Sequence, residues 1–122
     1  MKKSETGNLS IEISFLEGLR KRMPKNEEVL KVLGDDYTRV GRWEKGLEID
    51  LDLARLSPED PLVHYNLACS LSLLGNLKES AEALTKAIRL GYRDGNWLSK
   101  DPDLENLRKS SLFETVSSIL KS

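Results

Sequence analysis

Apolar residues recur every three or four positions along most of the chain, which is the spacing of an amphipathic α-helix. Leu30, Leu33, Tyr37 and Val40 show this spacing in residues 27–40, and similar patterns cover residues 43–56, 61–74 and 77–90. Prolines or single glycines separate these segments, and both residue types end helices. The pattern predicts an all-α chain of short helices.

The predicted helix ends carry local signals of their own. Asn26 and Asp60 can each accept a hydrogen bond from the first turn of the helix that follows, and Pro61 suits a first helical position. Glycine often follows the last turn of a helix because it adopts the left-handed conformation easily. Such glycines stand after three of the predicted helices, at Gly41, Gly75 and Gly91.

The helical pattern repeats after 34 residues. Similar residues stand at this offset in seven pairs: Pro24 and Pro58, Leu33 and Leu67, Gly34 and Ala68, Tyr37 and Leu71, Gly41 and Gly75, Leu53 and Ala87, Leu56 and Leu90. Each unit is expected to be two antiparallel helices, with small residues where they cross: Gly34 and Gly46 in the first, Ala68 and Ser80 in the second. One such hairpin cannot bury its apolar face alone, so the units are expected to stack into a solenoid.

These units resemble the tetratricopeptide repeat, whose pattern is W-x2-L-G-x2-Y…A-x3-F…P with a period of 34 residues. The first unit has Leu30-x2-Leu33-Gly34-x2-Tyr37, then Gly46-x3-Asp50, then Pro58. The second has His64-x2-Leu67-Ala68-x2-Leu71, then Ser80-x3-Leu84, then Tyr92. Departures from the pattern are His64, Gly46, Asp50 and Tyr92. The resemblance implies a right-handed solenoid of helix hairpins with about 2.5–3 repeats.

The boundaries expected from this pattern define one domain. Residues 1–9 are expected to be disordered, and residues 10–122 to form a half repeat (10–26), two repeats (27–60 and 61–94) and a degenerate C-terminal unit (95–122). Asp101 and Pro102 favour a helix start in the last unit. Its apolar residues predict a cap over the end of the solenoid: Leu104, Leu107, Leu112, Phe113, Val116 and Leu120.

Composition narrows the expected partners and location. The formal net charge is -1, so the chain as a whole lacks the field that attracts nucleic acid or acidic membranes. No apolar run is long enough for a membrane span or a signal peptide. The single cysteine cannot form an internal disulfide, which fits a reducing compartment. We expect a cytoplasmic protein without nucleic-acid or membrane partners.

Few residues are suited to catalysis or metal binding. With one histidine and one cysteine, the chain has no metal site built from several such ligands. His64 is expected in the core, and the carboxylates of Asp35, Asp36, Asp50 and Asp52 on solvated helix faces. The cations Arg20 to Arg22 are expected to complement a helix dipole. The sequence therefore predicts neither an enzyme nor a cofactor.

The outward faces of the two leading helices differ. That face is polar in the first unit, with Glu28, Lys31, Asp35, Thr38 and Arg39, and largely apolar in the second, with Leu62, Tyr65, Cys69, Ser72 and Leu73. The resemblance implies that these positions line a concave groove for partner peptides. We predict that the partner contacts Leu62, Tyr65, Asn66, Cys69 and Leu73, while Lys31 and Arg39 contact its polar or acidic portion.

Two alternatives stay open for this surface. The N-terminal segment or the Trp97–Leu98 region can instead cover the apolar ridge. A carboxylate clamp, as some tetratricopeptide proteins have, would use Lys31, Asn66 and Lys100, but Asp35 opposes it by charge repulsion. The predicted function is a protein-interaction module or adaptor that binds a protein or peptide segment. The alternative is a structural protein or assembly subunit that self-associates through the groove or an uncovered end, for example as a homo-oligomer.

Overall fold

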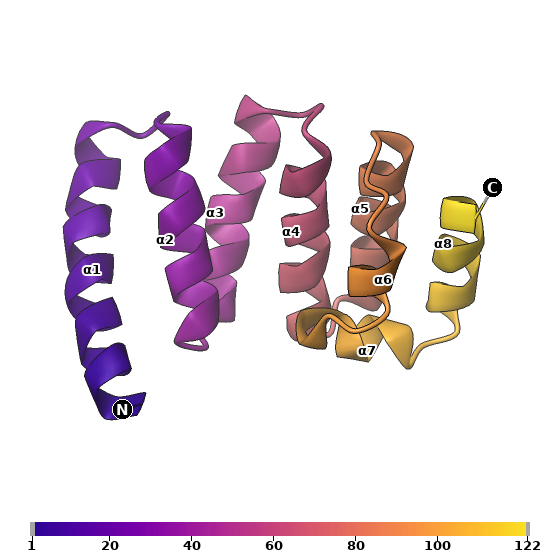
Figure 1. The fold of residues 1–122 in the computed structure, drawn as a ribbon. Coiled ribbons are helices and arrows are strands. Elements are labelled where there is room, and N and C mark those ends of the chain that lie inside the picture. The colour runs from indigo at the N-terminus through magenta and orange to yellow at the C-terminus, as the bar shows by residue number, and fades with distance from the viewer. Residues whose placement is uncertain (1, 122) are drawn as a thin grey trace.

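The structure, a computed structural model, describes residues 2–121, with side chains from residue 8 onward. Every regular element in this part of the chain is helical, and the long helices stand side by side in a row (Figure 1). The elements are α1 (Lys2–Arg22), α2 (Glu27–Arg39), α3 (Trp43–Leu56), α4 (Pro61–Leu73), α5 (Leu77–Arg89), α6 (Gly95–Leu98), the 3-10 helix η1 (Pro102–Leu104), α7 (Glu105–Arg108) and α8 (Leu112–Lys121).

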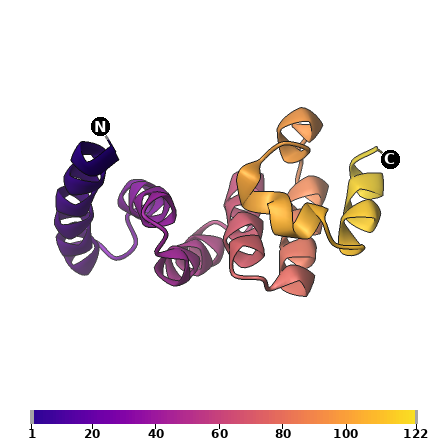
Figure 2. The same cartoon turned by 90° about the horizontal axis from the view of Figure 1, so that it is seen from below.

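The long helices pack mainly on their neighbours in sequence. The pairs α2–α3 and α4–α5 form hairpins, α3 also packs on α4, α1 on α2, and α8 on α5. The short elements η1 and α7 pack against α4, and Figure 2 shows the α6–α7 segment lying across the α4–α5 hairpin. This arrangement confirms the predicted all-α hairpin solenoid.

The predicted end signals are confirmed. The Asn26 side chain accepts a hydrogen bond from the Val29 amide at 3.1 Å, and that of Asp60 accepts one from the Leu62 amide at 2.9 Å. The three glycines have positive φ angles, which other residues rarely adopt: 80° at Gly41, 81° at Gly75 and 122° at Gly91.

Small residues lie at both helix crossings, as predicted. A β-carbon added to Gly34 would lie 3.1 Å from Cγ2 of Ile49, and one added to Gly46 would lie 3.3 Å from Oγ1 of Thr38. In the second hairpin the Ser80 hydroxyl donates a hydrogen bond of 2.7 Å to the Ala68 carbonyl, and both residues are fully buried. Larger side chains would push these helix pairs apart.

The core has two parts. One joins α1 to the first hairpin and the start of α4, and the other joins the second hairpin to the C-terminal elements. In the second part Leu104, Leu107 and Val116 are buried with Leu84 and Ile88 of α5. The predicted cap is thus confirmed, although it begins with the short 3-10 helix η1, and Leu112 stays 37% exposed.

Two expectations differ from the structure. Helix α1 begins at Lys2, so it includes residues 2–9, which were expected to be disordered; an existing helix extends at little cost per residue where no proline interrupts it. Asp36 and Asp50 were expected on solvated faces, but they are 3% and 7% exposed. That prediction was wrong because neighbouring helices cover both positions.

Candidate partner-binding site

The residues predicted to form the ridge on α4 have different environments. Leu62 is 59% exposed and Asn66 is exposed, whereas Leu73 is half-buried. Tyr65 and Cys69 are only 5% and 7% exposed. The structure brings four of the five to the linings of two adjoining pockets, Leu62, Tyr65, Asn66 and Cys69, and leaves Leu73 outside both.

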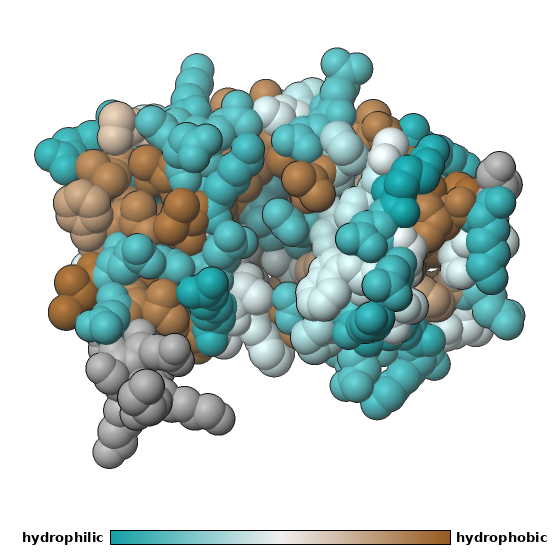
Figure 3. Space-filling model, in the orientation of Figure 1, coloured by the Kyte–Doolittle hydropathy of each residue, from teal (hydrophilic) through white to brown (hydrophobic). Residues whose placement is uncertain are grey.

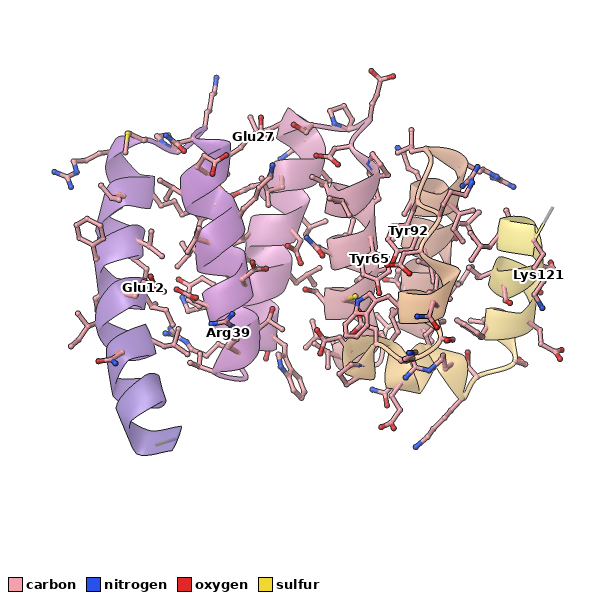
Figure 4. The ribbon with its side chains drawn as sticks, viewed as in Figure 1. Glu12, Glu27, Arg39, Tyr65, Tyr92 and Lys121 are labelled. Carbon is pink, nitrogen blue, oxygen red and sulfur yellow. The ribbon has the colours of Figure 1, made fainter. Side chains whose placement is uncertain are left out.

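The chain itself covers Tyr65 and Cys69. Tyr65 stacks on Tyr92, with ring centroids 4.4 Å apart and 15° between the ring planes (Figure 4), and Leu98 packs in the same cluster. The Tyr65 hydroxyl donates a hydrogen bond of 2.5 Å to Oδ2 of Asp101. The open alternative, in which the Trp97–Leu98 region covers the ridge, describes this structure. The neighbouring segment thus covers most of Tyr65 and Cys69, although both side chains still line the pocket described below.

Hydrogen bonds fasten this covering segment to α4. The Asn106 side chain donates to the Ser72 carbonyl at 3.0 Å, and the Leu107 amide donates to the Ser72 hydroxyl at 3.2 Å. Asp101 caps η1 by accepting from the Asp103 amide, while Arg108 donates to the Asp101 carbonyl at 2.7 Å. Hydrogen bonds from both side chains and backbone therefore hold the covering segment, residues 97–108, in place.

Beside the cover lies a pocket of about 260 Å³, between α2, α4 and the α6–η1 segment. Four aspartates line it, and Arg39 is the basic residue in its lining. We call it the acidic pocket; its aspartates are Asp35, Asp50, Asp101 and Asp103. Sequence reasoning missed this site, since Asp101 and Asp103 follow α4 by about thirty positions and no local motif places them there.

Burial shapes the electrostatics of the acidic pocket. Desolvation raises the pKa of Asp50 to about 7, against the hydrogen bond of 2.5 Å that its Oδ2 accepts from the Ser70 hydroxyl. Partial desolvation also raises the pKa of Asp35, although this residue is exposed, and that of the half-buried Asp103, where the charge of Asp101 adds to the effect. Carboxylates held this way are stabilised by any cation that enters the pocket.

A second, more apolar pocket of about 500 Å³ adjoins the first. Leu62 and Trp97, the latter 46% exposed, lie on its walls together with Asn66. We call it the Leu62–Trp97 pocket. Tyr65, Asn66 and Trp97 line both pockets, so the two form one continuous surface.

The predicted cations are divided between the site and its surroundings. Arg39 lines the acidic pocket and lowers the pKa of Asp35, opposing the effect of burial. Lys31 is exposed on α2 but lies outside both pocket linings. Figure 4 shows Arg39 near the end of α2 and Tyr65 farther along the row.

The remaining candidate chemistry is structural. The His64 ring nitrogen Nε2 lies 2.7 Å from the Pro58 carbonyl, and the residue is 5% exposed, as predicted for a core histidine. Burial, followed by the charge of Asp101, raises the pKa of the Cys69 thiol, which makes it a poor nucleophile. Among the described residues, no three or more His, Cys, Asp or Glu side chains are grouped to hold a metal ion. Nor does that part of the chain contain a helix long and apolar enough to cross a membrane.

Comparison with known proteins supports the fold. No family model matches the chain. The solved structure of MamA superimposes on 97% of the chain with a TM-score of 0.68 at 22% identity, covering 72% of that protein chain. MamA 41-end from Desulfovibrio magneticus RS-1 gives a TM-score of 0.68 at 15% identity, covering 97% of this chain and 70% of the other. These likenesses confirm the tetratricopeptide-like solenoid as a fold.

One curated relative has a similar sequence. A chloroplastic protein from Arabidopsis thaliana is 35% identical over 86 residues, which is 68% of this chain. The chain spans about a quarter of that protein, since the match covers 26% of it. The tetratricopeptide family therefore stays a prediction from sequence, supported by the fold.

Proposed function

We propose that the chain is a protein-interaction module, and that its partner segment occupies the surface formed by the acidic pocket and the Leu62–Trp97 pocket. The observation that carries this proposal is the continuity of a pocket lined by four aspartates with a pocket whose walls include exposed leucine and tryptophan side chains. An apolar anchor and a charged group on one partner segment would use both.

The partner segment should carry a basic side chain. Lysine and arginine are stabilised by nearby carboxylates, and burial raises the pKa of Asp50 to about 7, so a neighbouring cation would favour its charged form. A ligand carboxylate would meet repulsion from the same groups. The proposed ligand thus differs from the acidic portion that Lys31 and Arg39 were predicted to contact.

Trp97 is the proposed apolar anchor point. Tryptophan offers a large, rigid contact area and is enriched among residues that dominate binding energy. Leu62 extends the apolar surface, and the exposed Asn66 amide can bond the backbone of an extended peptide. The partner segment should therefore combine a hydrophobic residue with lysine or arginine.

Selection from a phage-displayed random peptide library tests this proposal. Selected peptides should be rich in a hydrophobic residue near lysine or arginine. Trp97→Ala should weaken their binding by about 2 kcal/mol or more, and Asp103→Asn should weaken it less but reduce its salt dependence. Trp43→Ala is the matched control, because Trp43 is also partly exposed, at 38%, but lies outside both pockets.

Three results would refute the proposed site. They are selection of acidic peptides, equal losses of affinity from Trp43→Ala and Trp97→Ala, and a Trp97→Ala variant that binds as well as the parent. The alternative function, self-association without a peptide ligand, would be favoured if no peptide were selected.

A further inference from the structure

The free side of α1 presents an apolar ridge. Ile11, Phe15 and Leu19 follow one another at four-residue intervals, so they lie along one side of the helix. Ile11 is 73% and Phe15 62% exposed, while Leu19 is half-buried at the edge of the core. Figure 3 shows hydrophobic residues gathered over this end of the molecule.

The repeat explains why this ridge is apolar. Phe15 stands one period, 34 residues, before Ile49. In α3, Ile49 is fully buried, with its Cγ2 beside Gly34 of α2, the first helix of the same hairpin. Within the described residues α1 has no such first helix, so the equivalent face is left without a helix packed on it.

Gly18 strengthens the case for a covering helix. Glycine inside a helix lowers its stability relative to alanine, so a close approach usually accounts for it. Gly34 and Gly46 have such a reason within the chain, but a β-carbon added to Gly18 would meet nothing within 4 Å. Gly18 is exposed on the same side of α1 as Phe15, where another backbone can approach it.

The two ends of the solenoid differ in polarity, and this indicates which surface covers the ridge. The exposed residues of α8 are polar except for Leu112: Glu114, Thr115, Ser118 and Lys121. Stacking of the α1 end of one copy on the α8 end of another would set the ridge against these groups. A contact between two α1 ends pairs apolar surface with apolar surface, and such a two-fold contact closes at a dimer.

Charges along α1 favour the antiparallel form of this contact. With the two-fold axis at the level of Glu17, Phe15 lies opposite Leu19 of the second copy. Arg22 then lies at the level of Glu12 of the second copy; both residues are exposed, and Glu12 also shares a hydrogen bond with the Asp36 carboxyl group of α2 in its own chain. Among the described residues Arg22 forms no ion pair. The antiparallel helix dipoles also favour this arrangement.

We infer that the Ile11–Phe15–Leu19 ridge of α1 is a docking surface for α1 of a second copy of this chain, forming a two-fold dimer. A standard interface buries roughly 800 Å² per partner, and a contact limited to one helix pair is expected to be smaller, so the dimer should dissociate reversibly. This surface is separate from the two pockets of the proposed function.

Sedimentation velocity of the full chain over a wide concentration range tests the dimer. The parent should show a reversible monomer–dimer equilibrium. Phe15→Glu should weaken it by about tenfold or more, because a charge would be buried without a partner, and should keep the parent circular dichroism spectrum. Trp97→Ala is the control that should leave the equilibrium unchanged, which separates this surface from the peptide site.

A charge exchange tests the antiparallel register, and thermal melting of each variant checks the fold, because Glu12 also contacts Asp36 of α2. Glu12→Arg and Arg22→Glu should each weaken the dimer by about two- to fivefold, the range expected for an exposed ion pair. The double variant should restore it. The inference would be overturned if the parent were monomeric or formed an open-ended series of larger species. It would also be overturned if Phe15→Glu left the dimer unaffected, if Trp97→Ala abolished it, or if the double variant were no better than the singles.

Discussion

Asp50 should destabilise the protein at neutral and alkaline pH, and Asp50→Asn should relieve this. The carboxyl group is 7% exposed, accepts a hydrogen bond from Ser70 and has Asp35 as a nearby like charge. Asparagine has nearly the same shape and keeps an oxygen for the Ser70 hydroxyl, but it carries no charge. The substitution therefore removes the cost of a buried ion while preserving the packing between α3 and α4.

The pKa of Asp50 gives the size of the effect. It rises from 3.8 to about 7 on folding, so between these values the folded state holds a proton that the unfolded state has released. Stability from this group is present below about pH 4 and is lost as the pH rises through 7. At about 1.4 kcal/mol per pKa unit, the loss is on the order of 4 kcal/mol. The asparagine NH2 group needs a partner in turn, so we expect a net gain of about 1–3 kcal/mol at pH 8.

Urea denaturation followed by circular dichroism at pH 5 and pH 8 measures this difference. Asp50→Asn should exceed the parent in free energy of unfolding by much more at pH 8 than at pH 5. Asp52→Asn is the matched control on the same helix, because Asp52 pairs with Arg20 and Arg55 near the surface. The reasoning fails if Asp50→Asn is less stable than the parent at pH 8, or if its advantage is the same at both pH values.

Three further outcomes are expected. Ala68→Leu should lower the free energy of unfolding by about 1–3 kcal/mol, because it overfills the helix crossing, whereas Lys31→Leu should change it by about 0.5 kcal/mol or less; equal effects in urea denaturation would contradict this. Leu107→Ala, in the cap, should cost about 2–5 kcal/mol, and Leu112→Ala clearly less, as thermal melting can show. A selected lysine-containing peptide should bind more weakly at pH 5 than at pH 8 by calorimetry, and Asp50→Asn should reduce that difference.

The repeat period and the local end signals were enough to predict the fold. These features depend on residues that are close together in the sequence, within one hairpin. They are the caps Asn26 and Asp60, the glycine at each hairpin and the small residues at the crossings. The cap was predictable for a related reason. Apolar residues such as Leu104 and Leu107 recur at helical spacing, so they form a face that must be covered. The element that precedes them in the chain is the second repeat, whose end is open to receive them.

The site could be predicted only in part. Leu62 was correctly expected to be exposed. The exposure of Tyr65 depended on whether a segment about thirty residues later in the chain lies over it. That segment consists of the short elements α6, η1 and α7. Hydrogen bonds from Asn106 and Leu107 to Ser72, which have no periodic signature, fasten it to α4. The acidic pocket arises from the same crossing, since the cover brings Asp101 to the face of α4.

The covering segment therefore changes what kind of ligand this solenoid can hold. It buries Tyr65 and Cys69 of α4 and adds Asp101 and Asp103 to the acidic pocket, while Trp97 at its edge provides new exposed apolar surface. Packing gains from Tyr65 and Leu98 stabilise the cover, so the desolvation of Asp50 and Asp103 persists although it opposes folding. A cation entering the pocket would recover part of that free energy. The free energy lost by desolvating these carboxylates would then favour basic partner segments over acidic ones.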